Sequence, residues 1–173
     1  RSLVAIAAGG SHSLGLRNDG MVIGWGDNSY GQSTPPGQLG NAIAIAAGAS
    51  HSLALQSDGT VVGWGRNDYG QRTPPVGLSN VLAIAAGSSH SLALRSDGTV
   101  VGWGNNVYGQ RTPPVGLSNV VAIAAGDSHS LALRSDGTVV GWGNNVYGQR
   151  TPPQGLSNAV AIAAGSYHSL ALR

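Results

Sequence analysis

Large apolar positions alternate with small or polar ones along three short stretches of the chain, and a longer polar stretch follows. Residues 43–47 and 51–56 alternate in this way, as β-strands do. The Asp-Gly pair at 58–59 is a tight-turn signal because it tolerates a positive φ, and residues 60–64 resume the strand pattern. Residues 65–80 are rich in Gly, Asn and Pro and show no period. The pattern predicts a three-stranded antiparallel meander followed by a long connection.

This unit recurs every 39 residues, so the chain is a tandem repeat. The period is marked by five histidines, His12, His51, His90, His129 and His168, and by four tryptophans, Trp25, Trp64, Trp103 and Trp142. The copies that begin at Gly87 and Gly126 differ at only three positions. We therefore expect a single repeat domain over residues 1–173, with repeats at 1–39, 40–78, 79–117 and 118–156 and a partial repeat at 157–173.

The two faces of each predicted sheet carry no charge, which indicates how the repeats pack. Along the first strand Ile43 and Ile45 alternate with Ala44 and Ala46, so we expect one bulky face and one small face. Sheets with two dry faces must stack, and several twisted meanders stacked in this way fan around an axis. A β-solenoid is the alternative, but its repeats are usually much shorter. The predicted fold is an all-β β-propeller of 39-residue three-stranded antiparallel blades.

The fifth repeat contains only two predicted strands, which leaves the ring incomplete. An open fan would expose an unpaired strand edge and two dry blade faces to water. At about 25 cal/mol per Å² of apolar area, a few hundred Å² on each face costs several kcal/mol. We therefore expect a partial or oligomer-completed propeller, in which further blades from a longer chain or a second copy close the ring.

Composition and charge exclude several classes of protein. The charged residues are 9 Arg and 7 Asp, without Lys or Glu, so strong helix formers are scarce and the net charge is only +2. This charge is too small to indicate a nucleic-acid partner. Without Cys there is no disulfide framework or thiolate chemistry, and no apolar run is long enough to predict a membrane span. The polar, Lys-free composition favours an extracellular or cell-surface bacterial protein.

The repeated histidines do not form a recognisable catalytic or metal motif. Equivalent positions on neighbouring sheets lie roughly 10 Å apart, too far to share one ion, so we interpret each His as bonding backbone groups near the first turn of its own repeat. His51, Ser52 and Asp58 are the residue types of a hydrolase triad, but adjacent strand residues point to opposite faces. The Gly-rich connections lack the Lys-Ser/Thr pair of a phosphate loop. The sequence predicts no catalytic residue, cofactor or metal site.

Aromatic and Arg residues recur at fixed places in the repeat. Each Trp ends the third strand between two glycines, and we interpret all four as core residues that pack over a neighbouring blade. The loop tyrosines fit either packing between blades or exposure. One row of Arg precedes the Asp-Gly turn and another follows Tyr-Gly-Gln. We interpret both rows as surface residues, the first paired with Asp, with a track for an anionic polymer as the alternative.

Differences among the copies cluster at one end of the predicted blade. They fall after the first strand and after the third strand, and these loops share an end because the two strands of a meander run in the same direction. Loops on a rigid scaffold commonly carry recognition. The candidate partner-binding residues are Asp27, Ser29, Tyr30, Arg66, Asp68, Tyr69, Val107, Tyr108, Asp127, Val146, Tyr147 and Tyr167. We expect a non-enzymatic scaffold that presents this loop rim to a macromolecular partner, most simply a protein.

The run Ala-Ala-Gly-x-x-His-Ser-Leu-Ala-Leu-x-x-Asp-Gly-x-Val-x-x-Trp-Gly-x-Asn-x-Tyr-Gly-Gln, from Ala46 and again from Ala85, resembles the regulator-of-chromosome-condensation repeat family. The resemblance implies propeller blades, typically seven to a ring, and the compact spacing is most similar to bacterial members of the β-lactamase inhibitor protein II type. It implies a β-lactamase inhibitor as one alternative function. A lectin-like binder of glycans or small ligands, with repeated sites between blades, is the other alternative.

Overall fold

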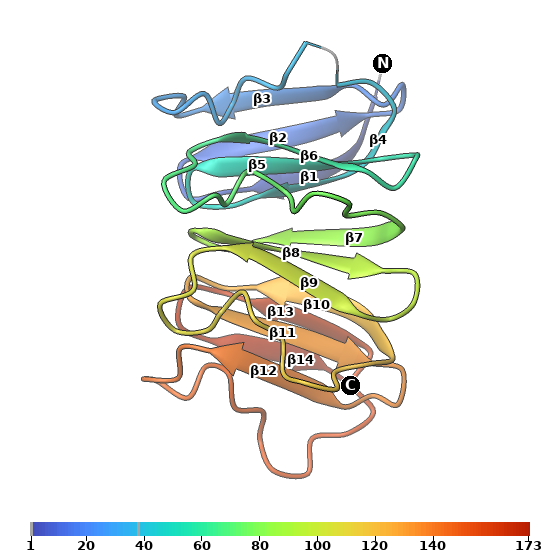
Figure 1. Ribbon diagram of the computed structural model, residues 1–173, viewed down its shortest axis with the longest axis vertical. Coiled ribbons are helices and arrows are strands. Elements are labelled where there is room, and N and C mark those ends of the chain that lie inside the picture. The colour runs from blue at the N-terminus through green and yellow to red at the C-terminus, as the bar shows by residue number, and fades with distance from the viewer. Residues whose placement is uncertain (1, 38) are drawn as a thin grey trace.

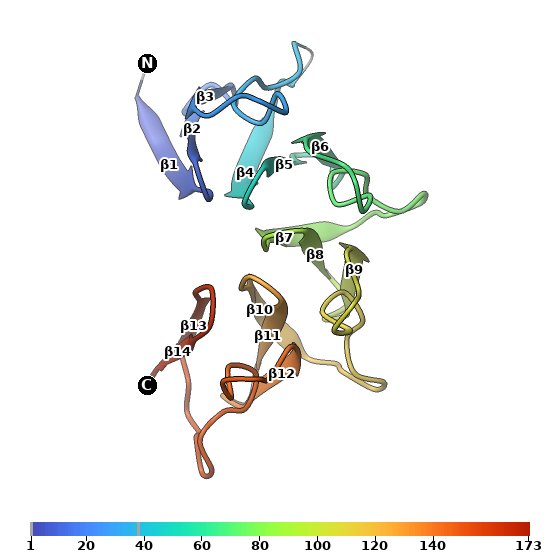
Figure 2. The same cartoon turned by 90° about the vertical axis from the view of Figure 1, so that its left-hand side faces the viewer.

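The computed structural model describes residues 2–37 and 39–173 as five small β-sheets that fan around a common axis (Figure 2). Four sheets have three antiparallel strands in chain order and the last has two. The strands are β1 (Leu3–Ala8), β2 (His12–Arg17), β3 (Val22–Gly26), β4 (Ala42–Ala47), β5 (His51–Gln56), β6 (Val61–Gly65), β7 (Val81–Ala86), β8 (His90–Arg95), β9 (Val100–Gly104), β10 (Val120–Ala125), β11 (His129–Arg134), β12 (Val139–Gly143), β13 (Ala161–Ala164) and β14 (Ser169–Leu172).

We number the sheets as blades 1 to 5 in chain order; Figure 1 labels their strands, and Figure 2 shows the blades following one another around the axis. The predicted all-β propeller of three-stranded antiparallel blades is confirmed, and the fan is not closed in this chain. Within the described residues no helix is long and apolar enough to cross a membrane.

The first strand of each complete blade contains a β-bulge, which decides which residues face the neighbouring blades. In blade 2 the register shifts just before Ala44, so that Ala44 pairs with Leu55 and Ile45 pairs with Ala54. Ile43 falls in the bulge and is 57% exposed. The expectation of one bulky and one small face is therefore wrong, because each face of the blade combines large and small side chains.

Each blade buries its Leu-bearing face against the Trp-bearing face of the next blade. Leu53 and Leu55 of blade 2 are fully buried in a cluster with Ala93 and Trp103 of blade 3. Equivalent clusters join blades 1 and 2 and blades 3 and 4. Because complete burial of a Leu contributes about 1.5–3 kcal/mol, the interfaces between blades stabilise sheets that are too small to fold alone.

The fan is open between its first and last blades (Figure 2). On blade 1, Ile6 is 77% and Trp25 is 50% exposed, and on blade 5, Leu170 and Leu172 are also largely exposed. The interpretation of the tryptophans as core residues is correct for the three on blades 2 to 4, which are 4–5% exposed. It is wrong for Trp25, which is half exposed because none of the described blades packs against this face of blade 1.

Candidate functional site

The variable rim is the end of the fan at which two kinds of loop meet. It comprises the turns between the first and second strands (9–11, 48–50, 87–89, 126–128 and 165–167) and the loops after the third strands (27–34, 66–73, 105–112 and 144–151). In blade 2 the Arg66 N–H donates to the Ser50 carbonyl at 2.9 Å, and an equivalent bond joins the two loops in the other complete blades. The turn and the loop of a blade therefore form one continuous surface.

Each rim loop holds its tyrosine on a frame of internal hydrogen bonds. In blade 2 the backbone N–H of Tyr69 donates to Gln71 Oε1 at 2.9 Å, and Gln71 is buried. Asn67 closes the other side, because Oδ1 accepts from the Arg72 N–H at 3.1 Å and Nδ2 donates to Thr73 Oγ1 at 3.1 Å. The sequence reasoning missed this Gln and Asn frame, although both residues recur at the same place in every complete repeat.

The frame leaves the tyrosine side chains in solvent. The loop tyrosines of blades 1 to 3 are about half exposed, and Tyr147 in blade 4 is 72% exposed. Tyr147 also meets Tyr167 of the next blade edge to face, with ring centroids 5.5 Å apart. The loop tyrosines are thus presented at the surface rather than packed between blades.

The part of the rim on blades 1 and 2 is charged. Asp27 accepts hydrogen bonds from the Ser29 hydroxyl at 2.6 Å and from Gln32 Nε2 at 2.7 Å, and the Ser29 contacts are the main cause that lowers the pKa of the Asp27 carboxyl. Arg66 pairs with Asp68 at 2.5 Å and lies over the Tyr30 ring, 4.9 Å from its centroid. Arg66 and Asp68 thus pair within one loop, Arg66 also contacts Tyr30 of the neighbouring loop, and Asp27 is bonded by uncharged groups of its own loop.

The variable loop positions on blades 3 and 4 carry no charge, although Arg111, Arg150 and Asp127 lie on the same part of the rim. Asn105 takes the place of Asp27 and accepts a hydrogen bond from the Val107 N–H at 2.9 Å, so the loop keeps its shape without a charge. Val107 and Val146 are 76% and 75% exposed, beside exposed tyrosines on the same loops. The variable loop positions therefore change from charged on blades 1 and 2 to uncharged on blades 3 and 4, where exposed valines stand.

Asp127 is set apart from the other candidate residues. It lies in the first turn of blade 4 and lines a shallow cavity of about 280 Å³ formed by the equivalent turns of all five blades. The other lining positions are small, such as Gly10, Ala49 and Ser88. Asp127 therefore shares the end of the fan with the tyrosines but lies at its centre rather than on the loops.

The histidines form bonds between blades, which corrects the prediction that each one bonds its own turn. His51 Nε2 lies 2.8 Å from Ser91 Oγ of the next blade, and Ser91 Oγ donates to the Gln71 carbonyl at 2.8 Å. Ser91 therefore accepts from His51, which fixes the Nε2–H tautomer and leaves Nδ1 without a hydrogen-bond partner. Trp103 Nε1 donates to the same carbonyl at 2.8 Å. We call this arrangement the His-Ser-Trp latch.

The latch contains a His and a Ser at hydrogen-bonding distance, but it is not a nucleophile and base. Both side chains are fully buried, and the serine proton is directed to a carbonyl. Burial lowers the pKa of His51 to about 4 and that of His90 to about 3, with neighbouring histidines as the second cause. The described residues contain no group of three or more His, Asp or Glu that could hold a metal ion.

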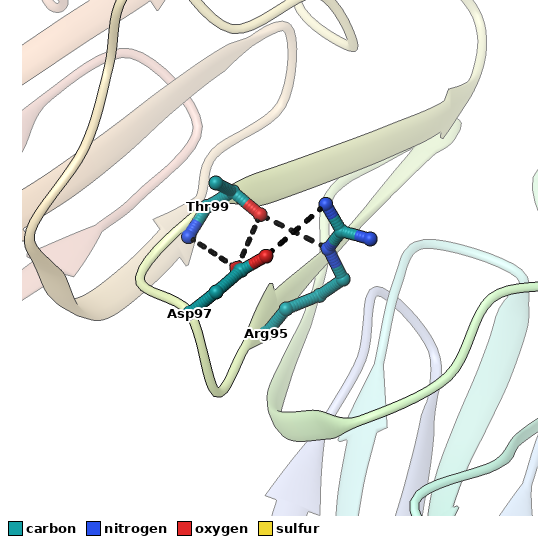
Figure 3. A network of polar contacts seen from close by, with 3 residues as sticks. All are labelled: Arg95, Asp97 and Thr99. Carbon is teal, nitrogen blue, oxygen red and sulfur yellow. Dashed lines mark hydrogen bonds and ion pairs between the residues drawn. The ribbon is translucent and has the colours of Figure 1, made fainter.

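The opposite end of the fan carries a polar cluster whose Asp-Thr hydrogen bonds recur in blades 2, 3 and 4. Figure 3 shows it in blade 3, where Asp97 Oδ1 accepts from the Thr99 N–H at 3.0 Å and from its hydroxyl at 2.6 Å. Arg95 Nε donates to Thr99 Oγ1 at 2.9 Å and its Nη2 lies 3.4 Å from Asp97. The hydroxyl of Thr99 is the main cause that lowers the pKa of Asp97. These hydrogen bonds stabilise the Asp-Gly turn.

The arginines that follow Tyr-Gly-Gln form hydrogen bonds within their own blades. Arg72 Nη1 donates to the Gly65 carbonyl at 2.9 Å, and Arg111 and Arg150 make the equivalent bond. These bonds tie each guanidinium to the end of the third strand of its own blade. This local use favours the interpretation of the row as structural surface residues over a track for an anionic polymer.

Comparison with known proteins agrees with this architecture. Four segments of the chain, residues 3–32, 42–71, 81–110 and 120–149, match the regulator of chromosome condensation (RCC1) repeat, and together they make up more than half of the sequence. No curated protein matches the chain.

Several solved structures are similar to the fan. Yeast RCC1 (Prp20) bound to Kap60 shares 28% identity and a TM-score of 0.80, over 98% of this chain and 53% of that one. Prp20p from Saccharomyces cerevisiae, described with its binding to Gsp1p and histones, shares 23% identity and a TM-score of 0.79, over 98% and 55%. The ectodomain of the Physcomitrella patens receptor kinase CR4 shares 24% identity and a TM-score of 0.81, over 98% and 50%. The chain spans about half the length of these structures.

Proposed function

Because this chain belongs to the regulator of chromosome condensation (RCC1) repeat family, we propose that it is a non-enzymatic binding module whose variable rim takes a protein partner. Relatives of this type bind proteins: yeast RCC1 (Prp20) is seen bound to Kap60, and Prp20p is described with its binding to Gsp1p and histones. The proposal for this chain adds the surface that is used and the residues that carry it.

The observation that carries the proposal is the row of exposed tyrosines on internally braced loops. Tyr69 and Tyr108 are each 53% exposed, while the Gln that holds each loop is buried. Such tyrosines offer a large amphipathic contact area, and little conformational entropy is lost when the loop is already fixed. A protein surface is wide enough to contact several blades together.

The variable loop positions, charged on blades 1 and 2 and uncharged on blades 3 and 4, suggest how the contact is divided. Val107 and Val146, with the tyrosines beside them, supply apolar area that gains from being covered. Asp27, Arg66 and Asp68 lie at the other part of the rim, where charges set orientation and specificity more than affinity. We propose that blades 3 and 4 form the centre of the contact and blades 1 and 2 its polar margin.

The proposal is tested with a pair of matched double variants. Tyr69→Ala/Tyr108→Ala alters the variable rim of blades 2 and 3, and Thr60→Ala/Thr99→Ala alters the opposite end of the same blades. Immobilised wild-type and variant chains are used to capture proteins from the source cells, and captured proteins are quantified by mass spectrometry.

We expect at least one protein that the wild type and the threonine variant retain equally and that the tyrosine variant loses by about tenfold or more. If every captured protein is retained by the tyrosine variant, or is lost only with the threonine variant, the contact lies elsewhere and the proposal is contradicted. Melting temperatures of all three chains are measured beside the capture, so that loss of binding is separated from loss of folding.

We also propose that further blades of the same repeat cover the two open faces. Ile6 and Trp25 on blade 1 occupy the positions that are packed against a preceding blade elsewhere in the fan. Leu170 and Leu172 on blade 5 correspond to Leu53 and Leu55, which are buried at the interface of blades 2 and 3. Sedimentation of the chain across a range of concentrations tests whether a second copy supplies this cover.

A further inference from the structure

The cavity at the centre of the variable rim has walls of small residues. The first strands of the blades converge there on the axis (Figure 2), and the lining positions are Gly, Ala or Ser except for Asp127. A Cβ on Gly87 would lie 2.5 Å from the Gly126 carbonyl oxygen, and a Cβ on Gly126 would lie 2.5 Å from that of Gly165. Because larger side chains do not fit at these glycines, the cavity of about 280 Å³ stays open. This volume is many times the roughly 30 Å³ that one water molecule occupies in the liquid.

Asp127 differs from the other carboxylates of the chain. Within the part of the chain that the structure describes, its side chain has no hydrogen-bond donor and no ion-pair partner. The carboxylate is partly buried and is the one charged group among the residues that line the cavity. The other six aspartates each accept a hydrogen bond from a donor in their own loop or turn: Asp19, Asp27, Asp58, Asp68, Asp97 and Asp136.

His129, two residues along the chain, does not neutralise Asp127. Burial is the main cause that lowers the pKa of His129 from 6.5, and the charge of Asp127, which raises this pKa, is a smaller one. The imidazole is therefore mostly neutral at pH 7, and its Nε2 lies 2.9 Å from Ser169 Oγ. The negative charge of Asp127 is left to solvent.

Backbone hydrogen bonds fix the turn that carries Asp127. The Gly126 N–H donates to the His129 carbonyl at 2.9 Å, and the Ser88 N–H of blade 3 donates to the carbonyl of Asp127 itself at 3.3 Å. The first strands of blades 3 and 5 both contact the first strand of blade 4, so Asp127 lies inside the fan and not at one of its open faces. The carboxylate is thus held in place before any ligand binds.

We propose that this cavity receives a lysine or arginine side chain of the protein partner, with its cationic group at Asp127. This use of the cavity rests on the proposed function, because Asp127 shares the end of the fan that the partner covers. A protein laid over the rim removes water from Asp127, and an ionised carboxylate without water or a partner is strongly destabilised. A cation from the partner offsets this loss with a charge-assisted hydrogen bond.

A metal ion fits the cavity less well than an organic cation. One carboxylate supplies two oxygen ligands, whereas Ca²⁺ takes roughly six to eight. The described residues contain no group of three or more His, Asp or Glu that could complete such a shell. Lysine and arginine carry a single charge on a long flexible stem, which can reach past the rim loops into the cavity.

The internal copies supply a variant that removes the charge and keeps the turn. Gly10, Ala49, Ser88 and Ser166 occupy the equivalent positions, so the turn itself does not require a carboxylate. Asp127→Ser gives blade 4 the residue of both neighbouring blades, and Asp127→Asn keeps the size of the side chain without its charge. Asp136→Asn is the matched control, because it removes the same charge at the opposite end of blade 4.

An NMR titration of the ¹⁵N-labelled chain tests the cavity without a partner. The probe is N-acetyl-arginine amide, and the matched neutral probe is N-acetyl-citrulline amide at the same ionic strength. We expect the arginine probe to shift the amide resonances of residues 126–128, 87–89 and 165–167 at least about twofold more than the citrulline probe does. Asp127→Ser should abolish this difference, and Asp136→Asn should leave it unchanged.

Calorimetric titration with the captured partner tests whether the cavity is used in the complex. The partner is the protein whose capture requires Tyr69 and Tyr108. We expect Asp127→Ser and Asp127→Asn each to weaken its binding at least about tenfold, and Asp136→Asn to leave its binding unchanged.

Equal shifts with the arginine and citrulline probes would overturn the assignment of the cavity to a cation. Partner binding that Asp127→Ser or Asp127→Asn leaves as tight as in the wild type would also overturn it, while the need for the tyrosines would leave the proposed binding surface standing. If no captured protein requires the tyrosines, the proposed function is refuted and the role of the cavity in that complex falls with it. The arginine titration separates these two failures, because it reports on the cavity alone.

Discussion

Mild acid should destabilise the fan through its buried histidines. His51 and His90 are fully buried in the His-Ser-Trp latch, and burial lowers their pKa from 6.5 to about 4 and about 3. The pKa values of His12 and His129 are lowered in the same direction, also mainly by burial. Because the folded pKa lies below the unfolded one, the unfolded chain binds more protons in this range. Stability is therefore complete above pH 6.5 and is lost as the pH falls towards the folded pKa values.

The size of the loss follows from the two largest shifts. Each pH unit between 6.5 and the folded pKa costs about 1.4 kcal/mol for each histidine. Between pH 6.5 and pH 5, His51 and His90 together cost about 4 kcal/mol, which is a large part of the stability of a domain of this size. The Asp carboxyls do not contribute in this window, because those with lowered pKa values titrate below 3.8.

Urea unfolding followed by Trp fluorescence at pH 7 and pH 5 measures this loss. The matched variant is His51→Gln/His90→Gln, because a Gln amide can donate to the latch serine but does not titrate. We expect the wild type to lose at least about 4 kcal/mol between the two pH values and the double variant to lose about 4 kcal/mol less than the wild type. Equal stability of the wild type at both pH values would refute the reasoning, as would an equal loss in the double variant.

Three further predictions concern single features of the fan. Tyr69→Ala/Tyr108→Ala should shift the melting temperature by no more than about 2–4 °C, measured by circular dichroism, because both rings are half exposed; a larger fall would make them core residues. Ser91→Ala should lower the free energy of unfolding in urea by about 1–3 kcal/mol, because it leaves a buried imidazole N–H without its acceptor. An unchanged unfolding midpoint would show that the latch does not stabilise the fold. Gly87→Ala should lower the free energy of unfolding by about 3 kcal/mol, because its Cβ would lie 2.3 Å from the His90 ring. Gly40→Ala has open space around it and should change this free energy by less than about 1 kcal/mol. Similar losses for both variants would contradict this reasoning.

The repeat, the strands and the blade could be predicted from the sequence because local signals determine them. The second strand of blade 2 lies at His51–Gln56, as the alternation predicts, and the third strand is shifted by a single residue, to Val61–Gly65. The Asp-Gly pair marks the tight turn between these strands, because Gly59 adopts a φ of 80°, which glycine tolerates without strain. Thirty-nine residues of local pattern, repeated, are sufficient for this level of the fold.

Contacts between repeats could not be predicted from these local signals. The latch joins His51 to Ser91, 40 residues away, and no sequence feature near either residue indicates that the two are paired. The bulge before Ala44 moved Ile43 out of the ladder, although simple alternation places Ile43 and Ile45 on one face. Register and interblade bonds depend on how two sheets meet, which periodicity within one strand does not specify.

The sequence predicts which loops share one end of the blade but not the hydrogen bonds that support them. The first turns and third-strand exits share an end of the blade because a meander requires it, and the bond between Arg66 and Ser50 shows them in contact. The exposure of Tyr69 depends on Gln71, whose side chain folds back into its own loop. A polar residue in a loop is usually a surface residue, so its burial here was not evident from its type.

Hydrogen–deuterium exchange of the chain with and without its captured protein partner tests most directly whether the variable rim is the binding surface. We predict slowed exchange in residues 105–112 and 144–151, the rim loops of blades 3 and 4, with less slowing in 27–34 and none at the Asp-Gly turns of the opposite end. Protection confined to the opposite end, or no protection of the rim in a saturated complex, would contradict the proposed binding surface.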